Sequence, residues 1–201
     1  LLLLDSNDPM NRPADRGITG KLYGGGGEMR LVQEIVLGIG GWRALEALGL
    51  HPDVCHLNEG HAALVTLERA RSYMQENKTD LWQAIWATRA GNVFTTHTPV
   101  AAGFDTFPLA LLMEYGSHYA AGLGVAPQEL LALGREHPDD GDESFNMAFL
   151  AARTCGKING VSRLHGEVSR RIFQRLYPRW PERDVPVEIH PADFSKGDTA
   201  R

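Results

Sequence analysis

Short apolar runs alternate along this chain with longer segments whose apolar residues recur at helical spacing. The runs at 54–57, 93–95 and 157–161 have the length of strands, and 185–187 begins an expected last strand. Leu1–Leu4 is interpreted as another strand, because a continuous apolar run is typical of a parallel strand buried on both faces. The pattern therefore predicts several parallel strands.

Helix signals fill the gaps between these runs. From Glu28 to Leu48, apolar residues such as Leu31 and Ile35 recur at helical spacing, and Gly49 is a natural C-terminal stop. Further helices are expected at 60–74, at 80–89 with Thr79 as its cap, at 108–134 with a break near 122–127, at 144–153 and at 163–176. Strands and helices that alternate in this way predict parallel βαβ units and an α/β fold.

Composition narrows the class of protein. The chain has 201 residues, 43% of them hydrophobic and 22% charged, as in an ordinary globular domain. Its formal net charge of −5 makes nucleic acid and anionic membranes poor partners. The two cysteines, Cys55 and Cys155, lie in apolar surroundings, which favours buried reduced thiols and a cytoplasmic location. No stretch is long enough to cross a membrane.

Polar, titratable residues follow two of the predicted strands. One segment is His56-Leu57-Asn58-Glu59-Gly60-His61 and the other is Thr95-Thr96-His97-Thr98-Pro99. In open α/β sheets, ligands bind beyond the carboxyl ends of the strands. A carboxylate and an imidazole side by side, as at Glu59 and His61, can accept from and donate to hydroxyl groups. We therefore expect a pocket for a ligand with many hydroxyl groups.

Simpler explanations exist for both segments. Glu59 could stabilise a helix N-terminus that Asn58 caps. A metal site is the other alternative, but two histidines five residues apart across a strand-to-helix junction fit no zinc motif, so we expect no metal. In the second segment, Pro99 biases Thr98 to an extended conformation that leaves backbone carbonyls for a ligand. The alternative there is a capped turn with His97 in the core.

A glycine run precedes the first long helix. Gly24, Gly25, Gly26 and Gly27 are not followed by the Lys-Ser/Thr pair of a phosphate-binding loop. Four glycines have high backbone entropy and nothing to pack, so this run is interpreted as a mobile gate loop.

Three motifs resemble one family. The segment Leu57–His61 resembles the Leu-Asn-acid-x-His segment of α-glucan phosphorylases, and His97-Thr98 resembles the segment that lines their glucosyl site. The third match runs from Asn146-Met147-Ala148 to Asn159–Glu167. The resemblance implies a Rossmann-like parallel sheet flanked by helices, the partial first domain of a two-domain glycosyltransferase fold of the GT-B type. Residues 1–187 would form this partial domain, and 188–201 a divergent, disordered tail.

The resemblance also implies a reaction. The family converts α-1,4-glucan or maltodextrin and phosphate reversibly into α-glucose 1-phosphate, with pyridoxal phosphate acting through its phosphate group. His97 would be the catalytic residue, contacting the reacting glucose through its ring and its main-chain carbonyl. The residues implied to bind substrate are Asn58, Glu59, His61, Thr98 and Asn159.

Some features depart from the family pattern. Gly26 stands where an acid is expected in the gate loop, and Glu188-Ile189-His190-Pro191 replaces an expected Thr-Asn-Gly segment. The second domain, with the cofactor lysine, is missing, so the chain alone is expected to be inactive. Its expected partners are that second domain and other copies of itself, through uncovered apolar surface. The rival hypotheses are a nucleotide-sugar glycosyltransferase domain, a non-enzymatic glucan-binding remnant and, third, a metal hydrolase.

Overall fold

The computed structural model describes residues 1–22 and 25–189. Gly24 of the predicted gate loop and residues 190–201 of the predicted tail lie outside these ranges. The strands are β1 (Cys55–Asn58), β2 (Asn92–Thr96), β3 (Thr106–Phe107), β4 (Phe145–Asn146), β5 (Lys157–Gly160) and β6 (Val187–Ile189). The α-helices are α1 (Gly27–Ile35), α2 (Gly41–Ala47), α3 (Leu64–Asn77), α4 (Leu81–Arg89), α5 (Leu109–Gly122), α6 (Pro127–Ala132), α7 (Met147–Thr154) and α8 (Arg163–Phe173).

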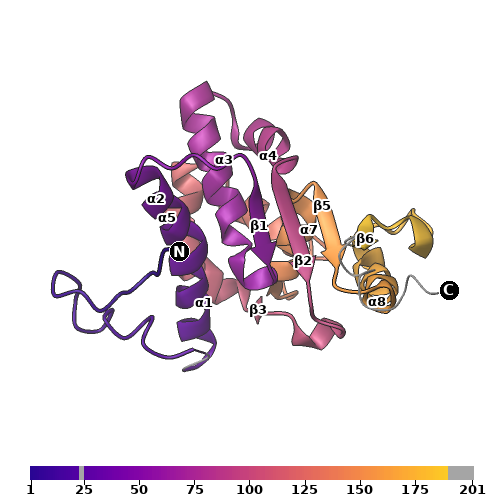
Figure 1. The fold of residues 1–201 in the computed structure, drawn as a ribbon, viewed down its shortest axis with the longest axis horizontal. Helices are drawn as coiled ribbons and strands as arrows, with labels where there is room; N and C mark the ends of the chain where they lie inside the picture. Colours follow the sequence, from indigo (N-terminus) through magenta and orange to yellow (C-terminus); the bar gives the residue numbers. More distant parts are fainter. Residues whose placement is uncertain (23–24, 190–201) are drawn as a thin grey trace.

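Four strands form a parallel sheet in the order β1-β2-β5-β6. Asn58 at the end of β1 lies opposite Thr95 of β2, and Thr96 lies opposite Gly160 of β5. Figure 1 shows α1, α2 and α5 beyond the β1 edge of this sheet and α8 beside β6. The strands β3 and β4 form a separate antiparallel pair. The α/β fold with a parallel sheet and flanking helices is thus confirmed, and the carboxyl ends of β1, β2 and β5 meet at one edge.

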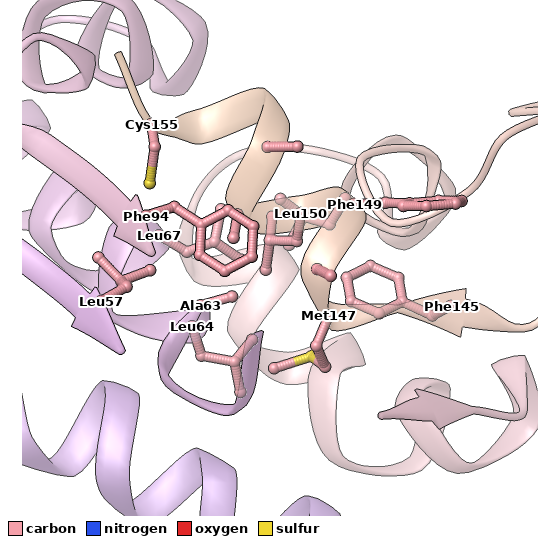
Figure 2. Close-up of a cluster of buried hydrophobic side chains, with 14 of the residues drawn as sticks. Leu57, Ala63, Leu64, Leu67, Phe94, Phe145, Met147, Phe149, Leu150 and Cys155 are labelled. Carbon is pink, nitrogen blue, oxygen red and sulfur yellow. The ribbon is translucent and has the colours of Figure 1, made fainter. Parts of the chain in front are cut away.

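The hydrophobic core lies between the sheet and the helices packed on it. Phe94 of β2 is fully buried, and Figure 2 shows it beside Leu67 of α3 and Leu150 of α7. Phe173 of α8 packs edge-on against Phe94, with ring centroids 6.1 Å apart, and stacks on Phe104 at 5.7 Å. Such aromatic pairs stabilise a core beyond the area that they bury. The loop containing Phe104 is therefore anchored to the core.

The long helix predicted from Glu28 to Leu48 is present but interrupted. A π-helical turn, Val36–Gly40, separates α1 from α2. A Cβ atom on Gly38 would lie 2.8 Å from the Cβ of Leu64, so the glycine permits close packing of this turn against the start of α3. Gly49 has φ +68°, which confirms it as the predicted stop after the helix.

The structure corrects the prediction for Leu1–Leu4, which form no strand. Leu1 and Leu3 are exposed, although Leu2, Leu3 and Leu4 line a groove beside the outer edge of β1. Apolar residues alone do not make a strand, because a strand also needs a backbone ladder with a neighbour.

Three other boundaries differ from the prediction. Asp80, not Thr79, caps α4, because its carboxylate accepts the Gln83 N–H at 2.8 Å. Phe145 and Asn146 pair with β3 instead of beginning a helix, and the Asn146 side chain caps α7. The expected last strand is present as β6 but begins at Val187, not at Val185.

The remaining expectations concern the thiols and membranes. Cys155 is buried and Cys55 is half-buried, and both are free thiols. Within residues 1–22 and 25–189, every helix is too short or too polar to cross a membrane.

Candidate functional site

Glu59 has an unusual backbone conformation directly after β1. Its φ of 73° and ψ of 172° lie in a region that is occupied almost only by glycine. Such a conformation costs about 1–3 kcal/mol and tends to occur at functional sites. The next residue, Gly60, is buried, and a Cβ atom there would lie 2.9 Å from the backbone nitrogen of Ala148. Close packing against the start of α7 thus constrains the turn that contains Glu59.

The carboxylate of Glu59 joins the ends of β1 and β2. Its Oε1 accepts hydrogen bonds from the backbone N–H of His97 and from the hydroxyl of Thr98, the latter at 3.1 Å. Its Oε2 accepts the N–H of Gly60 at 3.2 Å. The two polar segments singled out in the sequence therefore meet, and Glu59 also has the structural role of orienting the His97-Thr98 segment. Glu59, not Asn58, provides the side-chain cap of the short 3₁₀ helix Gly60–Ala62.

A polar cavity of about 190 Å³ opens beside this turn. Three of the predicted substrate-binding residues, Glu59, His61 and Thr98, line it. The other lining residues are Arg30 of α1, Gly60 of the turn itself, and Gly103, Phe104 and Asp105 of the loop before β3. Carboxylate, imidazole, hydroxyl and guanidinium groups thus converge on a small volume.

The other predicted site residues do not line this cavity. The ring of His97 is exposed, and its Nε2 lies 2.8 Å from Oδ1 of Asn58. The Nδ2 of Asn159 donates to Oγ1 of Thr95 at 3.4 Å, and Nε2 of His56 lies 2.6 Å from the same Oγ1. These side chains bond to one another along the carboxyl edge of the sheet.

Two charged residues of the cavity, Arg30 and Asp105, were not predicted. Nε and Nη2 of Arg30 donate to the two Asp105 carboxylate oxygens at 3.2 and 2.8 Å. Nε of Arg30 also lies 2.9 Å from Oε1 of Glu34, whose side chain is 1% exposed. Burial, with Asp105 nearby, raises the pKa of Glu34 to about 9. One sequence signal could have found this cluster: Glu34 follows Leu31 by three residues and so falls on the apolar face of α1.

His61 is half-buried between these charges. Burial is the main cause that lowers the pKa of its imidazole, and the positive charge of Arg30 is the next. Asp105 and Glu59 act in the opposite direction, toward a higher pKa. At neutral pH the ring is therefore uncharged, with one nitrogen as a donor and the other as an acceptor. That combination suits a hydroxyl ligand, which also donates and accepts.

Comparison with known proteins gives a consistent set of relatives. No protein-family model matches the chain. The maltodextrin phosphorylase of Thermococcus litoralis is 43% identical over 188 residues, which are 94% of this chain and 22% of that protein. The glycogen phosphorylase of Mycobacterium tuberculosis is 41% identical over 198 residues, 93% of this chain and 23% of that protein. The glycogen phosphorylase of Aquifex aeolicus is 33% identical, with 94% of this chain and 26% of that protein covered. The chain thus spans about a quarter or less of the length of these relatives.

Proposed function

The chain corresponds to a segment of an α-glucan phosphorylase, and we propose that it supplies the glucosyl-binding half of that enzyme's reaction site. In the complete protein the reaction would be the reversible phosphorolysis of α-1,4-glucan to α-glucose 1-phosphate. The substrates would be glycogen or maltodextrin and phosphate. The chain would be part of the first domain of a two-domain, GT-B type fold.

The observation that carries this proposal is the cavity built around Glu59. Its volume of about 190 Å³ is below the roughly 300–1,000 Å³ of sites for drug-sized ligands, which favours a single sugar unit. Glu59, the neutral ring of His61 and the hydroxyl of Thr98 offer acceptors and donors at close range. Several hydroxyl groups on one sugar ring can pair with such a set.

His97 has a separate role in this proposal. Glycosyl transfer develops positive charge on the sugar ring in an oxocarbenium-like transition state. A fixed carbonyl dipole aimed at the ring stabilises that charge. The hydrogen bond from the His97 N–H to Glu59 restrains this peptide segment, so the main-chain carbonyl of His97 could be held for that purpose. The other proposed substrate contacts, Asn58 and Asn159, lie along the same sheet edge.

Pyridoxal phosphate is not assigned to the cavity around Glu59 in this proposal. The cofactor needs a lysine, and none of the described lysines lines the cavity around Glu59. Lys157 is paired with Glu188 on the neighbouring strand. We therefore assign the cofactor and the phosphate-binding groups to the rest of a longer protein and derive no step through them here.

A reconstitution assay tests this division of roles. The purified chain, given maltodextrin, phosphate and pyridoxal phosphate, should release no more glucose 1-phosphate than a His97→Ala control. Adding the complementary segment of the Mycobacterium tuberculosis relative should restore release in the wild-type chain only.

Three outcomes would contradict the proposal. Turnover by the chain alone would show that it does not depend on a second half. Glucosyl transfer from a nucleotide sugar, without phosphorolysis, would favour the glycosyltransferase alternative. Saturable binding of maltodextrin with no turnover under any complementation would favour a glucan-binding remnant.

A further inference from the structure

Arg30 lies between two carboxyl groups and between two cavities. Its guanidinium contacts Asp105 and Glu34, as described above. A second cavity of about 260 Å³, which Glu34, Lys21 and Thr19 help to line, adjoins the cavity around Glu59. Arg30 and His61 line both cavities, so together they form part of the wall between them.

Glu34 is an unusual partner for this arginine. Both of its carboxyl oxygens are fully covered, and neither has a well-directed hydrogen-bond partner among the described residues. Burial beside Asp105 raises its pKa to about 9, so the carboxyl group is neutral at pH 7. A neutral acid can donate a proton in a hydrogen bond to a neighbouring carboxylate. One guanidinium then balances one charge, that of Asp105, and avoids an uncompensated buried charge.

We propose that Arg30 is a positioning residue of the sugar site, held by Glu34 and Asp105 so that it fixes the placement of His61 and of the loop 103–105. The inference rests on the proposed sugar-binding function. The Arg30–Asp105 contacts join α1 to the loop before β3, and Arg30 lines both cavities together with His61 of the turn after β1. The forked guanidinium contacts both oxygens of Asp105, a geometry that lysine cannot reproduce. The stacking of Phe104 on Phe173 anchors the same loop to α8.

The charges around His61 make the proposal measurable. Arg30 and Glu34 face it from α1, Glu59 from its own turn and Asp105 from the loop before β3, while Lys21 lies across the second cavity. Arg30 lowers the pKa of His61 and Asp105 raises it. Removing the charge of Arg30 should therefore raise the pKa of the His61 imidazole, and removing the charge of Asp105 should lower it. A merely structural role for Arg30 would not produce these opposite shifts.

The experiment is an NMR titration of the His61 imidazole in the full chain, combined with maltotriose binding. Arg30→Met should raise the pKa of His61 and weaken maltotriose binding about tenfold. Asp105→Asn should lower that pKa. Arg30→Lys keeps the charge but not the fork, so it should leave the pKa near the wild-type value and still weaken binding.

Two controls complete the set. Glu34→Gln imitates the neutral acid and should keep both the His61 pKa and maltotriose affinity close to wild type. Arg183→Met removes an arginine that is 85% exposed and should change neither quantity. Near-ultraviolet circular dichroism identifies any variant that fails to fold. If Arg30→Met does not fold, Arg30→Lys and Asp105→Asn still decide the outcome.

Failure of this inference and failure of the proposed function give different results. Unchanged His61 pKa values in Arg30→Met and Asp105→Asn would overturn the positioning role, as would wild-type maltotriose affinity in both Arg30 variants. If the pKa values shift as predicted but the wild-type chain binds no maltotriose, the sugar function fails, and with it the purpose assigned to Arg30. Loss of maltotriose binding in Glu34→Gln would overturn the neutral state of Glu34.

Discussion

Replacing Glu34 with glutamine tests the charge state of the most deeply buried acid near the site. Its side chain is 1% exposed, and its pKa is raised from an ordinary value of 4.5 to about 9, chiefly by burial. Between these two values the folded chain keeps a proton that the unfolded chain has lost. Each pH unit in this interval changes the free energy of unfolding by at most about 1.4 kcal/mol.

The direction of the pKa shift decides whether the free energy of unfolding rises or falls with pH. Because the folded-state pKa of Glu34 is raised, its stabilising contribution is complete below about pH 4.5 and is lost as the pH rises through about 9. Glutamine carries no titrating proton, so the stability of the variant does not fall with rising pH for this reason. Relative to Glu34→Gln, the wild-type chain should therefore lose roughly 1–3 kcal/mol of unfolding free energy between about pH 6 and pH 8.

Urea unfolding of both proteins at several pH values measures this difference, with the slope m checked for constancy. Glu76→Gln, which alters an exposed acid on α3, is the matched control and should follow the wild-type pH dependence. If the difference in unfolding free energy between the wild type and Glu34→Gln stays constant from pH 6 to pH 8, the reasoning is refuted. A difference that instead develops below about pH 4.5 would mean that Glu34 is ionised in the fold and stabilised by Arg30.

Three further substitutions test other parts of the structure by urea unfolding. Glu68→Gln should destabilise the chain by about 3–5 kcal/mol, since this fully buried carboxylate accepts hydrogen bonds from two arginines and a tyrosine; a loss below about 1 kcal/mol would contradict that. Gly60→Ala should cost about 1–3 kcal/mol, because the new methyl group would lie 2.9 Å from the backbone of Ala148. Asp80→Ala should cost about 1 kcal/mol through the lost helix cap, and more than Thr79→Ala if Asp80 is the cap.

Much of the fold could be predicted because its signals are local. The apolar runs and helical periods placed β1, β2, β5 and most helices within a few residues. Polar groups after β1 and β2 could be assigned to one sheet edge because parallel strands share their carboxyl ends. The contact between Glu59 and the His97-Thr98 segment follows from that topology.

The rest depends on contacts that no local pattern encodes. Arg30 and Asp105 are 75 positions apart and are joined only by the packing of α1 against the loop before β3. The strained backbone of Glu59 depends on the close approach of Gly60 to α7. Leu1–Leu4 have the composition of a strand, but strand formation depends on a backbone partner that composition does not supply.

Maltotriose titration of the isotopically labelled wild-type chain tests the sugar-binding claim most directly. The account predicts saturable shifts of the backbone amides of Gly60, His61, Thr98 and Gly103, which surround the cavity. The β-linked isomer cellotriose is the matched ligand control and should bind more weakly. Maltotriose shifts that are absent, or confined to residues outside this cavity, would contradict the assignment of a glucosyl site to the carboxyl edge of the sheet.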